Sequence, residues 1–307
     1  MNVLSLFDGM SVGQVALKKA GINYDSYRAS EIDKYAIMVT KDNHPNTIEI
    51  GDVKEVNGYT LPKIDLMIGG SPCTDFSFAG RARGMITTDK IEITDLDTYL
   101  RLKADGFEFT GQSYLFWEYI RIMKEVKPTY FLLENVRMSA KWKKVISDTL
   151  GVEPIKIDSR LVSAQKRTRL YWTNIPNVTV PEDRGILLKD ILIPRTDSLL
   201  DLEIPTEARV NYIAGRMKKG FVSKMFNTPE TEKAECIVAT CYKNMKDHVY
   251  QDEDGLRFMS CVEFERLQTL PDNYTKCVSK TQRRKMLGNG WTAESVAHIF
   301  SFLPKTF

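Results

Sequence analysis

The chain of 307 residues lacks any apolar run long enough to cross a bilayer, and its first residues lack the basic start and cleavage site of a signal peptide. It has only five cysteines and three histidines, and no pair of cysteines has the close spacing of a zinc knuckle. These absences predict a reduced, cytoplasmic protein without a metal site. The net charge of +3 is too small to prove nucleic-acid binding, and no internal repeat is visible.

An alternation of apolar runs and helical patterns fills the first 175 residues. The runs typical of strands lie at 3–7, 27–31, 48–53, 64–68, 130–133, 155–157 and 170–174. From about residue 176 the alternation ends, and prolines and irregular polar segments mark a smaller unit. We predict an α/β protein in which residues 1–175 and 256–307 form the larger domain and residues 176–255 the smaller one.

Two of these runs end in residues that can carry out chemistry. One run leads through Gly69 and Gly70 to Cys73, and another ends at Glu134. Because buried parallel strands bring their carboxyl ends to one edge of a sheet, we expect the thiol and the carboxylate to lie on the same edge. A thiol can attack an electron-poor ring while a carboxylic acid donates a proton to it. The pair suggests covalent chemistry on a pyrimidine, although a single cysteine is more often a small buried apolar residue.

A turn with two glycines follows the first strand, where Gly9 and Gly13 would let a ligand approach the backbone, and Ser11 could cap the next helix. Glu31 ends the second strand roughly 20 residues later, which is the place of a ribose-binding acid in dinucleotide folds. Asp52 ends the third strand. The three-glycine phosphate fingerprint is missing, which argues for a nucleoside ligand without phosphates, with S-adenosylmethionine as the obvious candidate.

Charge is unevenly distributed along the rest of the chain. Residues 213–225 and 276–285 contain basic side chains and no acid, so each segment is a candidate for phosphate contacts or merely a solvated surface. Residues 85–111 form an insertion with six acids and three basic residues. We expect this acidic insertion to pack beside the loop after Cys73 or to become ordered on binding, because an acidic segment is poorly suited to a phosphate backbone.

Five segments, in chain order, resemble the motifs of DNA (cytosine-5) methyltransferases: residues 7–13, 70–77, 134–136, 165–169 and 288–290. Thr74 stands where most bacterial members have glutamine, and the region after residue 176 is short for a target-recognition domain. Both features are similar to the compact phage enzymes and to eukaryotic de novo methyltransferase catalytic domains. The resemblance implies a Rossmann-like S-adenosylmethionine-dependent fold with a small, mostly irregular or β target-recognition domain.

The resemblance also implies roles for individual residues. Cys73 would attack C6 of a flipped-out cytosine in a short duplex DNA sequence, Glu134 would supply a proton, Arg167 would steady the covalent intermediate and Arg169 would contact the O2 edge. The cofactor residues would be Phe7, Asp8, Gly9, Gly13, Glu31, Ile32, Asp52, Val53, Pro72, Asn289 and Trp291. The DNA-contacting residues would be Ser77, Arg81, Arg83, Asn135, Val136, Gln165, Lys218, Lys219 and Lys224.

Three alternatives stay open. The same chemistry could act on transfer RNA, although a separate basic region between Gln165 and the last helix favours duplex DNA. A catalytically inactive regulatory paralogue is a second alternative, and the presence of Cys73, Glu134 and Arg167 argues against it. A nicotinamide oxidoreductase is disfavoured because the phosphate-binding glycines are missing.

Overall fold

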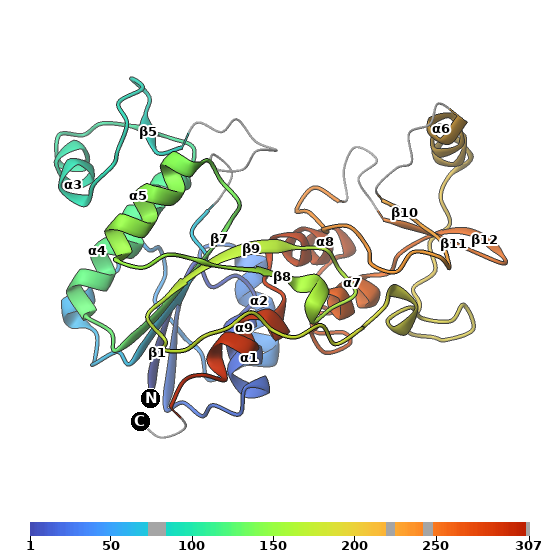
Figure 1. Cartoon of the computed structure of the whole chain (residues 1–307), viewed down its shortest axis with the longest axis horizontal. Coiled ribbons are helices and arrows are strands. Elements are labelled where there is room, and N and C mark those ends of the chain that lie inside the picture. Colours follow the sequence, from blue (N-terminus) through green and yellow to red (C-terminus); the bar gives the residue numbers. More distant parts are fainter. Residues whose placement is uncertain (73–83, 219–224, 242–247, 305–307) are drawn as a thin grey trace.

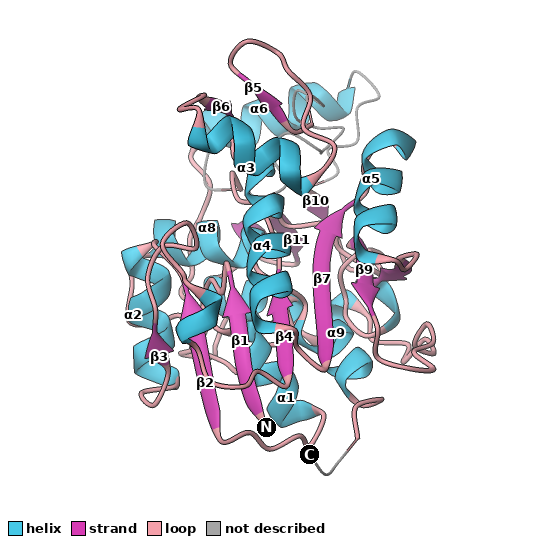
Figure 2. Cartoon of the chain, turned by 90° about the vertical axis from the view of Figure 1, so that its left-hand side faces the viewer, coloured by secondary structure: helices cyan, strands magenta, loops and turns pink. Residues whose placement is uncertain are grey.

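A seven-stranded sheet forms the centre of the molecule in the computed structural model, which describes residues 1–72, 84–218, 225–241 and 248–304 (Figures 1 and 2). Its strand order is β3-β2-β1-β4-β7-β9-β8. The strands are β1 (Asn2–Leu6), β2 (Ser26–Ser30), β3 (Ile48–Glu49), β4 (Leu66–Gly69), β7 (Tyr130–Val136), β8 (Ile155–Asp158) and β9 (Thr168–Thr173). The first five of these run parallel, and β9 is antiparallel to both β7 and β8. This arrangement confirms the predicted α/β fold.

The order of the strands reverses between β1 and β4. From β1 the chain proceeds to β2 and β3 on one side, and β4 and β7 lie on the other side. In open α/β sheets, ligands bind beyond the carboxyl ends of the strands at such a reversal. The end of β1 and the end of β4 are therefore where a binding site is expected.

Helices cover both faces of the sheet because side chains alternate between the faces along each strand. On one face Leu4, Met67 and Leu133 pack with residues of α4 (Phe116–Val126) and α5 (Ala140–Leu150). On the other face, apolar strand residues pack with α1 (Val12–Lys19) and α9 (Ala293–Phe300). The last helix therefore returns to the first one, and α2 (Lys34–Asn43) lies on the same side (Figure 1).

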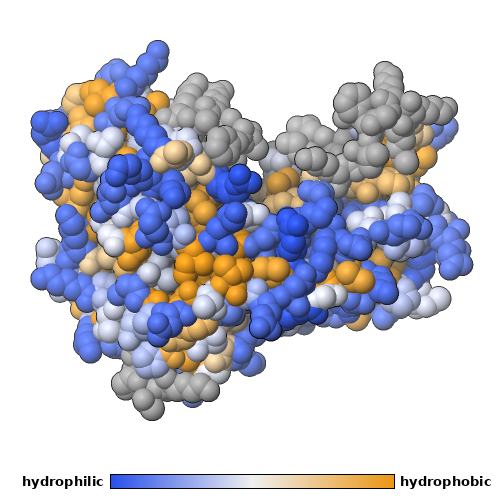
Figure 3. All heavy atoms as spheres, viewed as in Figure 1, coloured by the Kyte–Doolittle hydropathy of each residue, from blue (hydrophilic) through white to orange (hydrophobic). Residues whose placement is uncertain are grey.

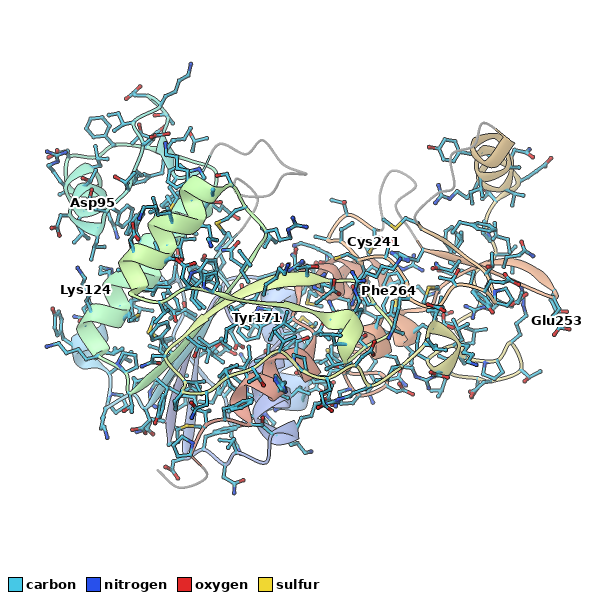
Figure 4. All side chains as sticks on the ribbon, viewed as in Figure 1. Asp95, Lys124, Tyr171, Cys241, Glu253 and Phe264 are labelled. Atoms are coloured by element: carbon cyan, nitrogen blue, oxygen red, sulfur yellow. The ribbon has the colours of Figure 1, made fainter. Side chains whose placement is uncertain are left out.

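The acidic insertion packs on α4. It contains the paired strands β5 (Ile86–Thr87) and β6 (Phe109–Thr110) and the helix α3 (Leu96–Ala104), which Asp95 caps by accepting from the Thr98 amide (Figure 4). The Tyr99 hydroxyl and the Lys103 ammonium both donate to the buried Glu118 carboxylate of α4, at 2.5 and 2.6 Å. These contacts position the insertion, whereas the loop after Cys73 lies outside the described residues.

A second, three-stranded sheet lies away from the first one. It contains β10 (Phe226–Asn227), β11 (Val249–Asp252) and β12 (Gly255–Phe258). The expected boundary after residue 255 therefore falls inside β12, which pairs with β11. The remaining elements are α6 (Glu207–Lys218), α7 (Cys261–Leu267), α8 (Lys280–Asn289) and the short helices η1 (Gly58–Thr60), η2 (Ser113–Leu115), η3 (Ser159–Leu161) and η4 (Leu188–Asp190).

The two parts of the chain share a hydrophobic cluster. Ile237 and Cys241 pack with Phe264 of α7 and with residues of α1 and α2 (Figure 4). In the space-filling view the upper outline of the molecule is indented between the side that carries the acidic insertion and the side that carries α6 (Figures 1 and 3). Within the described ranges, no helix combines the length and the apolar character that crossing a membrane requires.

Candidate active site

The ends of β4 and β7 form the floor of the site. The strands are parallel neighbours, and Gly69 lies opposite Leu133 in their register. The next residues, Gly70 and Glu134, are therefore adjacent, which confirms the prediction that the two runs end at one edge of the sheet. A Cβ added to Gly70 would lie 3.1 Å from Oε2 of Glu134, so the close approach requires glycine. Cys73, three residues further on, lies outside the described residues.

The Glu134 carboxylate is almost buried and is held from two sides. Its Oε1 lies 3.0 Å from Nε of Arg169, and its Oε2 accepts from the indole Nε1 of Trp291 at 2.9 Å. Arg169 comes from β9, the antiparallel neighbour of β7, whereas Trp291 comes from the turn before α9. The strand pattern predicted a role for Glu134 and the family resemblance implied one for Arg169, but neither predicted the tryptophan contact.

Arg167 is buried, and its donors are directed to the backbone. Its Nη1 donates to the carbonyl of Ile237 at 2.9 Å, and its Nη2 donates to the carbonyls of Gly288 and Gly290 at 3.1 and 2.8 Å. Burial lowers its pKa, as does the neighbouring Arg169. Arg167 lines the cavity described below, but its hydrogen bonds join the segment before β9 to Ile237 and to the turn at 288–290. The resemblance instead implied that it steadies the intermediate.

A second thiol lies beside these arginines, and no pattern in the sequence predicted it. Nη1 of Arg167 lies 3.2 Å from Sγ of Cys236. Burial alone would raise the pKa of Cys236, but the charges of Arg167 and Arg169 outweigh it and the pKa lies below its usual value. Cys236 therefore helps to hold the Arg167 side chain in place.

Two residues expected to contact DNA are core residues, so these predictions were wrong. Gln165 is fully buried; its amide donates to the Leu267 carbonyl and its Oε1 accepts from the Ile237 amide. Asn135 is 1% exposed and donates to the carbonyl and the hydroxyl of Ser71. In each case burying an amide side chain requires internal partners, and these partners leave nothing for DNA. Asn135 instead ties the start of the loop that leads to Cys73 to β7.

A cavity of about 780 Å³ opens beyond the ends of β1, β2 and β4. Ten of the eleven residues predicted to bind a cofactor line it: Phe7, Asp8, Gly9, Glu31, Ile32, Asp52, Val53, Pro72, Asn289 and Trp291. Val136, Glu134, Arg167 and Arg169 line it as well. Gly13 is not among the lining residues; it lies in α1, where an added Cβ would meet the Tyr27 hydroxyl and Ile68 at 2.6 Å. Its small size serves helix–sheet packing.

The turn after β1 is held in an unusual backbone conformation. Phe7, Gly9 and Ser11 all have positive φ angles, of 56°, 61° and 54°. The Ser11 hydroxyl does not cap α1 but bonds to the Asp8 carboxylate, which also accepts from the Tyr27 hydroxyl at 2.7 Å. Burial raises the pKa of Asp8 to about 6, against the opposing effect of these hydrogen bonds. The Asp8 carboxyl is therefore a support of the turn.

Glu31, Ile32 and Asp52 give the cavity its chemical character. The Glu31 carboxylate accepts from the amides of Gly9, Ile32 and Asp33, at 2.7, 2.7 and 2.8 Å, which uses three of its roughly four acceptor positions. Asp52 accepts from the Lys54 amide and lies 3.3 Å from its ammonium. Ile32, next to Glu31 in the chain, is 68% exposed and gives the cavity an open apolar surface.

Each cation in the described lining of the cavity has a partner. Lys54 pairs with Asp52, Lys285 pairs with Asp33 at 2.8 Å, Arg169 pairs with Glu134, and Arg167 donates to carbonyls. The acids Asp8 and Glu31 lie beside them, and neither forms an ion pair with a cation of the described residues. Such a lining suits a ligand that is neutral or positive and carries no phosphate.

The last residue of the acidic insertion and the residues that follow it form a wall of the cavity that the sequence pattern did not predict. Gly111, Gln112, Tyr114 and Leu115 all line it. The ring of Tyr114 stacks on Phe109 of β6 with centroids 4.6 Å apart. Residues 112–127 have only the apolar periodicity of a helix, which carries no signal for a binding wall.

Comparison with known proteins identifies the family. The family model of the C-5 cytosine-specific DNA methylases matches residues 1–97, 101–151 and 201–304. This chain belongs to that family. It is 30% identical over 220 residues to "Orphan methyltransferase M.SPRI" of Bacillus phage SPR, covering 66% of this chain and 45% of that protein. The chain thus spans less than half the length of the first curated relatives that it matches.

Solved structures share the fold of this methylase family member. The chain superposes on a Spodoptera frugiperda DNMT2 variant with a TM-score of 0.68 and 18% identity, over 98% of both chains. It superposes on the S. pombe Dnmt2 methyltransferase with a TM-score of 0.67 and 17% identity, over 98% of this chain and 97% of that one. Both likenesses extend beyond the large sheet to nearly the whole chain.

The two basic segments of the chain differ in what the structure describes of them. In 276–285, Lys280 and Arg284 pair with Glu203, and Arg283 pairs with Glu265, so these side chains hold the fold together. The other segment contains Lys218, whose backbone ends α6 and whose side chain is not described. The remaining expected DNA contacts, Ser77, Arg81, Arg83, Lys219 and Lys224, lie outside the described residues.

Proposed function

We propose that the protein transfers a methyl group from S-adenosylmethionine to C5 of a cytosine in duplex DNA, through a covalent bond between Cys73 and C6. One observation carries the proposal. Glu134, held by Arg169 and Trp291, lies beside the strand end that leads to Cys73 and on the floor of the cavity. Membership of the C-5 cytosine-specific family supports the same reaction and position.

The residues of the cavity fit the cofactor. When bound, S-adenosylmethionine supplies an electrophilic methyl group on a positively charged sulfur. Glu31 retains an acceptor position for a ribose hydroxyl, Ile32 offers an apolar surface for adenine, and Asp52 offers a carboxylate for the adenine amine. The paired cations offer no phosphate site among the described lining residues, which favours this cofactor over a dinucleotide.

The chemistry follows from the poor nucleophilicity of C5. The Cys73 thiolate adds to C6, forming the S–C6 bond, and the displaced electron pair makes C5 enamine-like. Glu134 protonates or hydrogen-bonds N3 and so balances the charge that this addition places on the ring. C5 would then accept the methyl group from the bound cofactor. The bond between the methyl carbon and the sulfonium sulfur would break, and S-adenosylhomocysteine would be released. Loss of the C5 proton to solvent and breaking of the S–C6 bond restore the aromatic ring and free Cys73.

The protein must also reach the base. The target atom is inaccessible within a duplex, so the cytosine must be flipped out. The indentation between the side of the acidic insertion and the side of α6 is the place that we propose for the duplex (Figure 3). Residues 1–175 with 256–307 would then carry the chemistry, and residues 176–255 would recognise the sequence, as proposed from the sequence.

Methylation mapping tests the proposal. The protein is incubated with S-adenosylmethionine and a random-sequence duplex, and modified cytosines are read by bisulfite sequencing. We expect methylation within a fixed short motif, lost in Cys73→Ala and retained in the matched control Cys277→Ala. Wild-type protein that binds S-adenosylmethionine but modifies only RNA would refute the DNA substrate. Activity that survives in Cys73→Ala would refute the covalent mechanism.

A further inference from the structure

Trp291 connects three parts of the site that are distant in sequence. Its ring lines the cavity, and its Nε1 donates to Oε2 of Glu134 at 2.9 Å, across 157 positions of the chain. The same indole nitrogen lies 2.9 Å from the position that a Cβ on Gly70 would occupy. The indole therefore touches the carboxylate, the wall of the cavity and the backbone that leads to Cys73.

The turn that carries Trp291 is fixed by the core. Nη2 of Arg167 donates to the carbonyls of Gly288 and Gly290, and the Gln268 amide donates to the carbonyls of Leu287 and Gly290 at 2.6 and 3.1 Å. Gly288 leaves no room to shift, because an added Cβ would lie 2.2 Å from the backbone of Val238. A turn held in this way presents the indole in one position.

The two arginines of the 167–169 motif thus reach Glu134 by different routes. Arg169 contacts Oε1 directly at 3.0 Å. The Arg167 guanidinium donates to backbone carbonyls rather than to an acid of the described residues, and these bonds fix the turn whose tryptophan holds Oε2. A carboxylate held at both oxygens keeps one orientation toward the space above it, and orientation of a proton donor affects the rate of its transfer.

We propose that Trp291 is a positioning residue of the reaction: its indole N–H orients the Glu134 carboxylate, and Arg167 acts on the reaction through the turn that carries Trp291. The proposal rests on the proposed methyl transfer. It assigns to the tryptophan a role beyond closing the cofactor pocket. Loss of the hydrogen bond from the indole to the Glu134 carboxylate is therefore expected to lower the rate by about 10-fold or more, because hydrogen bonds to charged groups are strong.

Trp291→Phe separates the two roles, because phenylalanine keeps an aromatic wall but removes the N–H. We expect kcat for methyl transfer to fall about 10- to 100-fold while KM for S-adenosylmethionine changes less than about threefold. Trp172→Phe is the matched control. Trp172 lies in β9, and the substitution removes another buried indole N–H, which donates to the Ser147 hydroxyl of α5 at 3.0 Å. We expect wild-type kcat from this control. A higher KM with unchanged kcat in Trp291→Phe would overturn the proposal and leave Trp291 as a pocket wall.

A second readout needs no activity. The chain has four tryptophans, and ¹⁵N spectra resolve one indole N–H signal from each. Trp291→Phe identifies the signal of Trp291 by its loss. We expect Glu134→Gln to shift this signal and leave the other three in place, because a neutral amide replaces the charged acceptor. A Trp291 signal that does not respond to Glu134→Gln would overturn the contact on which the proposal depends.

Arg167 is tested with Arg167→Lys, which keeps the buried positive charge, both alone and combined with Trp291→Phe. In single-turnover assays, Arg167→Lys is expected to slow methyl transfer in the wild-type background and to add less than about twofold in the Trp291→Phe background. Fully multiplicative effects would overturn the indirect route. If wild-type protein methylates no duplex while the indole signal still responds to Glu134→Gln, the DNA substrate fails and the positioning contact stands; the same variants are then compared on the nucleic acid that is methylated.

Discussion

Replacing Gly70 with alanine should disrupt the floor of the site, formed by the ends of β4 and β7, without removing any functional group. The added Cβ would lie 2.9 Å from Nε1 of Trp291 and 3.1 Å from Oε2 of Glu134. Neither neighbour can move freely, because Arg169 holds the other carboxylate oxygen and the turn before Trp291 is bonded to Arg167. The side chains must separate, and the hydrogen bond between them is lost.

The size of the effect follows from these contacts. Overpacking of a core costs about 1–3 kcal/mol of unfolding free energy. A hydrogen bond to a charged group contributes about 1.5–3 kcal/mol, which corresponds to roughly 10- to 150-fold in rate if the whole bond is lost in the transition state. We therefore expect Gly70→Ala to lower both the melting temperature and kcat.

Two assays check this prediction. Transfer of labelled methyl groups to duplex DNA at saturating S-adenosylmethionine gives kcat, and thermal unfolding gives the stability. Gly215→Ala is the stability control, because no atom lies within 4 Å of its added Cβ and the residue is in α6; alanine there should stabilise by up to about 1 kcal/mol. A Gly70→Ala protein with wild-type kcat and melting temperature would refute the reasoning.

Three further predictions concern the support of the site and its charges. Burial lowers the pKa of His248 from 6.5 to about 4, so the unfolded chain takes up a proton before the folded one and the free energy of unfolding decreases as the pH falls from 6.5 toward 4. His248→Phe should remove up to about 3 kcal/mol of this decrease, as measured by urea unfolding at several pH values, and an unchanged pH profile would contradict the prediction. Gln165→Ala should lower the unfolding free energy by about 1–3 kcal/mol without weakening DNA binding by the folded protein, as measured by fluorescence anisotropy, because its amide bonds only to the core. Lys280→Gln should leave the salt dependence of DNA binding unchanged because Lys280 pairs with Glu203, whereas Lys224→Gln should lower the slope by about one; equal slopes would argue against this division of the basic residues.

The position of the floor of the site could be predicted from local patterns. The apolar runs that end at Gly70 and Glu134 are buried on both faces, and such strands pair in parallel. Their adjacent carboxyl ends followed directly, and the register of Gly69 with Leu133 confirms it. The acids Glu31 and Asp52 line the cavity for the same reason, since each follows the carboxyl end of a strand.

The direction of individual side chains could not be predicted in the same way. Gln165 and Asn135 lie within the family's motifs but turn into the core, where their amides find carbonyl partners. Gly13 is small because Tyr27 approaches it, although a glycine turn near a ligand has the same sequence pattern. Motif membership shows that a position matters, but burial decides whether it binds a ligand or holds the fold.

The sequence by itself determined the α/β order, the strand ends that carry Glu134 and the acids of the cavity, because strand burial and strand ends depend on short-range periodicity. Only the tertiary structure decided that Trp291 meets Glu134 and that Arg167 fixes the turn between them. These contacts join segments more than 100 residues apart, and they form only when the last helix packs back on the first one. The local sequence contains no period or spacing that reports such a contact.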